Sequence, residues 1–207
     1  MGRLHVGQPP TIVLPGYFKY PPNVDAAWYF VESILPRIVA RIPTVRVRLV
    51  GDADDRVLSL RRYKGVIVTG FVEDMRTELA AADVIAVPLR FGSGTRIKIL
   101  EAFAHRIPVV STALGAEGID AVDGRQIMLG NTPQSFSDAC VRLLTDERCR
   151  AAAIHSAHEL FLTTYRWDNI HSIVASVGAR VAGNGELARP DMANTQPSRV
   201  GSHVGRR

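Results

Sequence analysis

The chain has 207 residues, of which 46% are hydrophobic and 22% are charged, so it can bury one substantial core. The formal net charge is +5, and the stretch from Asn184 onward supplies +2 of it through four arginines set against Glu186 and Asp191. No basic stripe with interleaved aromatic residues appears, so we expect no nucleic-acid partner. The charge is typical of a solvated surface with a basic tail.

The two cysteines, Cys140 and Cys149, show no CxxC spacing, and the histidines do not cluster. This pattern favours a reduced, cytoplasmic protein without structural zinc, and we expect neither a metal nor a cofactor. No apolar run reaches the 18 or so residues of a membrane span, and the start, MGRLHVGQPP, lacks a signal-peptide core. We therefore expect at most peripheral contact with the inner face of a membrane.

Short apolar segments alternate with helical patterns along the chain. Asn23 is predicted to cap the first helix, Pro36 to kink or break it, Asp74 to cap a later helix, and Thr132 with Pro133 to start another. Strands are predicted at 11–14, 45–50, 66–68, 84–89, 108–111 and 126–129. Helices are predicted at 23–42, 54–62, 75–82, from about 95, at 132–144, and at 150–181 with an interruption near 165–168.

Buried strands that alternate with helices indicate an α/β fold, a doubly wound parallel sheet with Rossmann-like layers. We expect a single domain over residues 11–183, after a short lead at 1–10 and before a disordered basic tail at 184–207. Ligands bind such sheets at the carboxyl ends of the strands. The loops predicted there are 16–23, 51–54, 70–74 and 92–95.

The stretch RFGSGTRIKILEAFAHRIPVVST, from Arg90 to Thr112, combines a glycine turn with the start of a helix. Unpaired N–H groups and the positive end of the helix dipole favour an anion such as phosphate. Glu101 lies further along this helix and can accept hydrogen bonds from sugar or ribose hydroxyls. The alternatives are structural: Arg96 and Lys98 as solvated helix cations, and Glu101 as a partner of Lys98 or Arg106.

Several blocks in order carry a resemblance to a known family: PGYFKYPPNVDAAWYF, VRVRLVG, VTGFVEDMRTELAAADVIAVPLRFGSGTRIKILEAFAHRIPVVSTALGAEGI and YRWDNI. Together they span roughly residues 11–181. The succession resembles the C-terminal, donor-binding half of family 4 glycosyltransferases, which have the GT-B architecture. The resemblance implies that the chain binds a nucleotide-sugar. In this family a hexosyl group then passes, with retention at the anomeric carbon, to an acceptor held by the N-terminal half.

The resemblance also implies a set of donor-binding residues. Glu101 matches a glutamate that binds the ribose, and Arg96 and Lys98 are candidates for neutralising phosphate charge. The loop of Gly70, Phe71 and Val72 would meet the base, and the turn of Gly92, Ser93, Gly94 and Thr95 would lie near the diphosphate or the sugar. Weaker candidates are Gly16, Lys19 and Glu117. The resemblance assigns no catalytic residue here.

Three positions depart from the family pattern. Ser93 stands where many members have a second glutamate, and Tyr17 and Asn23 stand where many have an arginine and a lysine that hold the diphosphate. Lys19 or Arg96 could compensate for the missing cations. The identity of the donor therefore stays open.

Three hypotheses about function remain. The first is a glycosyltransferase whose acceptor-binding half comes from a separate chain. The second is a non-catalytic nucleotide-sugar-binding subunit or a truncated remnant. The third is a dinucleotide-binding domain, since Gly92-Ser93-Gly94 begins a G-x-G-x-x-G pattern, but Ile97 replaces the third glycine and the loop follows the fourth strand.

Overall fold

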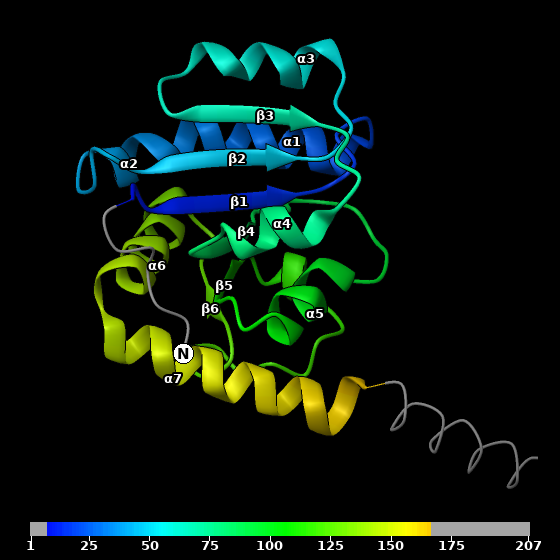
Figure 1. Ribbon diagram of the computed structural model, residues 1–207, viewed down its shortest axis with the longest axis vertical. Helices are drawn as coiled ribbons and strands as arrows, with labels where there is room; N and C mark the ends of the chain where they lie inside the picture. The colour runs from blue at the N-terminus through cyan, green and yellow to red at the C-terminus, as the bar shows by residue number, and fades with distance from the viewer. Residues whose placement is uncertain (1–7, 167–207) are drawn as a thin grey trace, which may run out of the picture. The chain divides into compact units, whose positions relative to one another are not determined.

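The computed structural model describes residues 8–166. Its centre is a sheet of six parallel strands in the order β3-β2-β1-β4-β5-β6, as Figure 1 shows. The predicted α/β class and parallel sheet are confirmed. The strands are β1 (Thr11–Pro15), β2 (Arg46–Val50), β3 (Val66–Gly70), β4 (Val84–Val87), β5 (Val109–Ser111) and β6 (Met128–Leu129).

Helices connect the strands on both faces of the sheet. They are α1 (Pro21–Tyr29), α2 (Leu35–Val39), α3 (Asp55–Leu58), α4 (Met75–Ala80), α5 (Ile97–Ala104), α6 (Pro133–Thr145) and α7 (Glu147–Leu160). Short 3-10 turns occur at η2 (Ser59–Arg62) and η3 (Leu114–Ala116), and π-helical turns at η1 (Phe30–Ile34) and η4 (Phe161–Tyr165). Within residues 8–166, no helix has the length and apolarity needed to cross a bilayer.

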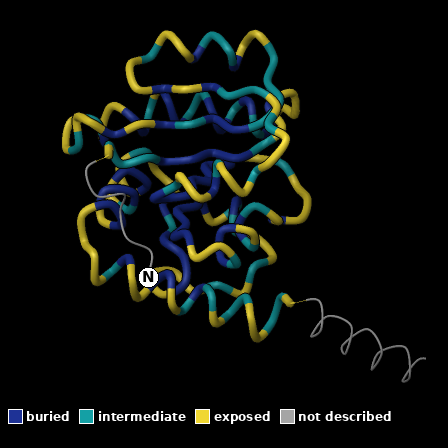
Figure 2. Tube along the Cα trace, viewed as in Figure 1, coloured by how far each residue is buried: buried dark blue, intermediate teal, exposed yellow. Residues whose placement is uncertain are grey.

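Each face of the sheet has its own hydrophobic core, because successive side chains of a strand point to opposite faces. In β1, Ile12 and Leu14 belong to a first core, which also holds buried residues of α1, α2 and α6. Val13 belongs to a second core with residues of α4, α5 and α7. Figure 2 shows the central strands as mostly buried. The near-continuous apolar strands follow from this burial on both sides.

The strand order reverses between β1 and β4. The chain runs outward from β1 to β3, and α4 then brings it back to lie on the other side of β1 as β4. The loops after β1 and β4 therefore diverge at the carboxyl edge and leave a crevice there. This crevice is the switch point of the sheet.

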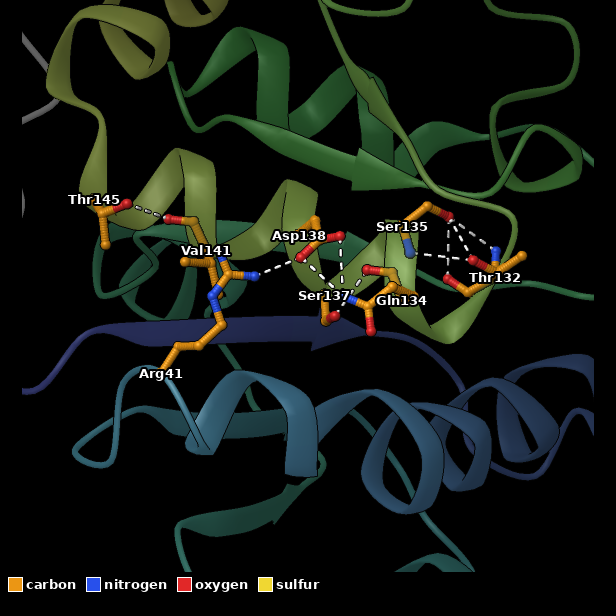
Figure 3. A network of polar contacts seen from close by, with 8 residues as sticks. All are labelled: Arg41, Thr132, Gln134, Ser135, Ser137, Asp138, Val141 and Thr145. Carbon is orange, nitrogen blue, oxygen red and sulfur yellow. Dashed lines mark hydrogen bonds and ion pairs between the residues drawn. The ribbon is translucent and has the colours of Figure 1, made fainter.

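The start of α6 confirms the predicted capping residues. Thr132 Oγ1 accepts a hydrogen bond from Ser135 N, and Thr132 N donates to Ser135 Oγ, so the two residues satisfy each other's free groups. Pro133 occupies the first turn, where it costs no hydrogen bond. Figure 3 shows that Arg41, just after α2, pairs with Asp138 of α6; the distance from Nη1 to Oδ1 is 2.5 Å.

The prediction that Asn23 caps the first helix is wrong. The helix begins at Pro21, and Tyr20 is its N-cap, because two prolines already set the helical backbone of the first turn. Asn23 N donates to Tyr20 O at 3.0 Å, which leaves its side chain free for another role. Ahead of Pro36, the helix widens into the π-turn η1 and resumes as α2 with Pro36 in its first turn.

Other boundaries differ by a few residues. The helix predicted from about Thr95 begins at Ile97, the strand predicted at 126–129 is reduced to Met128–Leu129, and Asp74 caps α4 as predicted. The last helix begins at Glu147 and ends, through η4, at Tyr165. The predicted helix beyond 166, the lead at 1–7 and the tail at 184–207 lie outside the described residues. The domain boundary at 183 stays a prediction.

Candidate functional site

Backbone hydrogen bonds join the loops that follow β1, β2 and β3. Gly16 N donates to Val50 O at 2.9 Å, Phe18 N to Asp52 O at 2.7 Å, and Gly51 N to Gly70 O at 3.1 Å. An added Cβ at Gly51 would lie 2.0 Å from Gly16 O, so this approach requires glycine. Three of the four predicted loops thus form one connected surface.

The fourth loop, between β4 and α5, contacts the start of α1. Gly92 has a φ of 103°, and a Cβ there would lie 2.6 Å from Pro22 Cγ. Arg90, just after β4, donates from Nε to Asp25 Oδ2 at 2.9 Å and from Nη2 to Asp25 Oδ1, and its guanidinium lies 4.5 Å from the centre of the Tyr29 ring. The glycine loop is therefore attached to α1 across the switch point.

A small cavity of about 10 Å³ lies at the switch point. Its lining comes from both sides of the crevice. The segment of β1, the loop after it and α1 supplies Leu14, Pro15, Phe18, Asn23 and Ala26, and the segment of β4, the loop after it and α5 supplies Ala86, Val87, Pro88, Leu89 and Lys98. Apart from Asn23 and Lys98, the lining side chains are apolar. Polar chemistry at the floor of the crevice therefore comes from these two residues.

Lys98, the second residue of α5, is a partly buried cation that forms no ion pair among the described residues. Its Nζ donates to Asn23 Oδ1 at 3.2 Å. Burial, and secondarily the neighbouring Arg96, lower the pKa of Lys98 from 10.5 to about 8, while Glu101 raises it. An anion in the crevice would supply the missing negative charge. The alternative of a solvated helix cation is wrong for Lys98.

Arg96, at the N-cap of α5, is buried and joins two loops. Its Nη2 donates to Leu114 O at 2.9 Å and to Gly92 O at 3.4 Å, and lies 3.8 Å from the exposed carboxylate of Glu117. Its Nε has no hydrogen-bond partner. Arg96 is therefore not a solvated cation either, and its visible contacts hold the glycine loop against η3.

Glu101 lies three residues beyond Lys98 on α5 and is exposed. Among the described residues its carboxylate makes no hydrogen bond or ion pair, so the structural alternative of pairing with Lys98 or Arg106 is not observed. A free, exposed carboxylate on the helix that follows the glycine loop is able to accept hydrogen bonds from hydroxyl groups. Ser93, Gly94 and Thr95 are exposed on the same loop.

The remaining candidates lie at the same edge of the sheet. Phe71, after β3, is 76% exposed, and Val72 packs against the second core. Lys19 Nζ pairs with Asp52 Oδ2 at 2.8 Å in an exposed contact, so its charge is already partnered. Within the described part of the chain, no group of His, Cys, Asp and Glu is placed to hold a metal ion.

Sequence reasoning missed Arg90, Asp25 and Tyr29, and it misplaced Asn23. The contact between Arg90 and Asp25 joins residues 65 positions apart, and no local pattern predicts such a contact. The paired prolines at 21 and 22 could have predicted the correct helix start, because proline favours the first turn of a helix. With the helix starting at Pro21, Asn23 is no longer at the cap position.

The fold is that of the C-terminal domain of a GT-B glycosyltransferase. It is similar to the C-terminal domain of a glycosyl transferase group 1 family protein from Francisella tularensis, with a TM-score of 0.63 and 19% identity over 77% of this chain and 89% of that one. It is also similar to HepE from Anabaena, solved with UDP-glucose, with a TM-score of 0.64 and 20% identity over 86% of this chain and 50% of that one.

Residues 9–146 match the family model described as glycosyl transferases group 1. The chain belongs to this family. Among curated proteins it is similar to a phosphatidyl-myo-inositol mannosyltransferase of Mycolicibacterium smegmatis, 26% identical over 83% of this chain and 46% of that protein. It also matches 35% of an uncharacterized 44.6 kDa protein in the cps region of Klebsiella pneumoniae. The chain thus spans less than half the length of these relatives.

Proposed function

We propose that this chain binds a nucleotide-sugar at the switch point and supplies the donor side of a retaining hexosyl transfer. The diphosphate lies over the floor of the crevice, where Lys98 meets its charge. Glu101 accepts hydrogen bonds from the ribose, and the loop of Gly70, Phe71 and Val72 meets the base. The turn of Gly92, Ser93, Gly94 and Thr95 lies beside the diphosphate or the sugar.

The observation that carries this proposal is that the Lys98 ammonium forms no ion pair within residues 8–166. The amine lies at the carboxyl edge between β1 and β4, where open α/β sheets bind ligands, and its hydrogen-bond partner is neutral. The start of α5 adds a second favourable contribution, since free N–H groups and the helix dipole also favour an anion. Both features favour a phosphorylated ligand over a neutral one.

Two relatives support the choice of ligand. HepE was solved with UDP-glucose, and the Mycolicibacterium relative is named as a mannosyltransferase. Neither specifies the base or the sugar for this chain. The dinucleotide-binding hypothesis is disfavoured, because the glycine loop follows β4, whereas the dinucleotide fingerprint follows the first strand.

The acceptor needs a second surface. Transfer requires the acceptor hydroxyl to be held facing the donor carbon, and we propose that a separate acceptor-binding half or chain supplies that surface. Cytoplasmic location, with contact at the inner face of a membrane, stays part of the proposal. We also propose that phosphate charge is met by Lys98 without a metal ion, so donor binding should be insensitive to EDTA.

The first prediction is tested by calorimetric titration with UDP, GDP, ADP and their sugar conjugates. We expect one nucleotide to bind, and Lys98→Met to weaken it at least tenfold, or about 1.4 kcal/mol, because the substitution keeps the stem and removes the charge. Glu101→Gln should weaken binding less, since an amide oxygen still accepts one hydrogen bond.

The matched control is Lys64→Met, which removes an exposed lysine just before β3, at the opposite edge of the sheet. It should leave the affinity unchanged. Binding that is equal in wild type and Lys98→Met would contradict the proposed site. A folded chain that binds none of these nucleotides would contradict donor binding altogether. Binding without transfer, when an acceptor-binding half is added, would favour the non-catalytic subunit.

A further inference from the structure

The side chain of Asn23 spans the switch point. Its Nδ2 donates to Tyr17 O at 3.0 Å on the β1 side, and its Oδ1 accepts from Lys98 Nζ at 3.2 Å on the α5 side. The chemistry fixes the orientation of the amide, because a carbonyl can only accept and an ammonium can only donate. Asn23 thus links the loop after β1 to the cation of α5.

The amide group is also held by packing. An added Cβ at Gly16 would lie 3.2 Å from Asn23 Cγ and 3.3 Å from Nδ2, so Gly16 forms the surface on which the amide rests. The backbone N–H of Asn23 is satisfied by Tyr20 O, so the side chain is not needed to cap α1. Packing and two hydrogen bonds leave the amide little freedom to turn.

Lys98 lacks any comparable support from its own helix. Lys98 lines the small cavity together with apolar residues that include Leu89 and Pro88, and four rotatable bonds allow the amine many positions. Asn23 provides its hydrogen bond within the described chain. A neutral acceptor can orient the ammonium and still leave its positive charge for a ligand, whereas a carboxylate would neutralise it.

We propose that Asn23 is a positioning residue, which holds the Lys98 ammonium at the switch point so that its charge meets the diphosphate of the donor. The role of the diphosphate rests on the proposed function above. The claim about Lys98 itself does not depend on a ligand. The sequence predicted Asn23 as a helix cap, at a position where many family members have a lysine, and gave no indication that it contacts Lys98.

The pKa of Lys98 depends on the charged groups of its own helix and of the elements packed against it. On α5 these are Arg96, which lowers the pKa of Lys98, and Glu101, which raises it. On α1, Asp25 is paired with Arg90, and in the loop after β1, Lys19 is paired with Asp52. Since burial holds the pKa near 8, affinity for a diphosphate should fall as pH rises through 8, because the amine then loses its charge.

The experiment combines Asn23→Ala, Asn23→Asp, Lys98→Met and the double variant Asn23→Ala/Lys98→Met, each checked for folding by circular dichroism. Titration of the Lys98 ¹³Cε signal by NMR reads its pKa without any ligand. Asn23→Asp should raise that pKa, because a carboxylate stabilises the ammonium. Asn23→Ala should lower it, because the ammonium loses its acceptor.

Calorimetry with the nucleoside diphosphate that binds wild type then reads affinity at pH 7. Asn23→Ala should weaken it several-fold, and Asn23→Asp at least tenfold because its carboxylate faces the phosphates. In the Lys98→Met background, Asn23→Ala should have no further effect. A merely structural role of Asn23 would weaken binding in both backgrounds, and that result would overturn the proposal.

The two proposals fail in different ways. A Lys98 signal that titrates identically in wild type, Asn23→Ala and Asn23→Asp would overturn the positioning role even if nucleotide binding is intact. A Lys98 pKa that shifts as expected in a chain that binds no nucleoside diphosphate would support the positioning of Lys98 and overturn the donor site.

Discussion

Arg106 has a backbone conformation that side chains rarely adopt. It follows the C-cap of α5 with a φ of 58°, in the left-handed region. Ile107 N donates to Ala102 O and Arg106 N to Phe103 O, which is the hydrogen-bond pattern of a Schellman motif. Glycine is the usual residue at this position, because it has no Cβ to strain the backbone.

We therefore expect Arg106→Gly to stabilise the protein by about 1 kcal/mol. The substitution releases the backbone strain, and the greater conformational entropy of glycine in the unfolded chain offsets part of that gain. Urea denaturation measures the change in the free energy of unfolding. Arg106→Ala is the matched control, because it removes the side chain and keeps the Cβ. Equal effects of the two substitutions would show that backbone strain is not the cause.

At single residues, contacts were what the sequence predicted least well. Lys98 was selected as a cation near a glycine turn, and its role as a donor-binding residue stays a prediction. Its burial was not foreseen, because part of the lining around it comes from β1 and α1. Asparagine is a residue type that often caps helices, but the two prolines place the helix start at Pro21, two residues before Asn23. Both outcomes depend on contacts between segments far apart in the sequence.

At the scale of elements, the attachment of the glycine loop to α1 rests on Arg90. The guanidinium makes two hydrogen bonds with Asp25 and lies over Tyr29, while half of its side chain remains exposed. Exposed ion pairs contribute 0 to about 1 kcal/mol, and an aromatic contact adds a similar amount. A fork of two hydrogen bonds places this pair at the upper end of that range.

We expect Arg90→Ala to cost about 1 kcal/mol of stability, and a double-mutant cycle with Asp25→Ala to show that most of this is coupling between the two residues. Arg90→Lys should recover part of it, since lysine keeps the charge but lacks the planar fork. Chemical denaturation gives the values.

The pair of Arg76 and Asp74, two residues apart and largely exposed, serves as the control. Arg76→Ala should change stability by less than about 0.5 kcal/mol. Losses that simply add for Arg90 and Asp25 would show that their contact does not hold the loop.

Element types were largely predictable, because strands buried on both faces have continuous apolar runs and Thr132-Pro133 is a strong start signal. The boundaries were less predictable where tertiary contacts decide them. Residues 126 and 127 are buried as expected of a strand, yet β6 pairs with β5 over Met128 and Leu129 alone. The strand order, and with it the place of the switch point between β1 and β4, was not predicted, because strand pairing joins segments far apart in the chain.

At the scale of the described unit, β1 couples the two cores. Ile12 and Leu14 pack in the core with α1, α2 and α6, and Val13 packs in the core with α4, α5 and α7. β1 also pairs with β2 and with β4, on either side of the switch point. Loss of either core therefore removes support from the strand that the other core needs, and residues 8–166 should unfold in one transition.

Phe136 and Phe103 test this coupling, since each is fully buried in a different core. Replacing either with alanine should cost about 3–5 kcal/mol through lost burial and a cavity. In a Trp167→Phe background, the fluorescence of Trp28 reports the core beside α1, and far-ultraviolet circular dichroism reports all helices. Phe103→Ala should shift both signals to the same lower urea midpoint, although Phe103 lies on the opposite face from Trp28. The contrary result would be a circular dichroism transition in two steps, with the Trp28 midpoint unchanged from wild type. It would show that the two cores unfold independently and that β1 does not couple them.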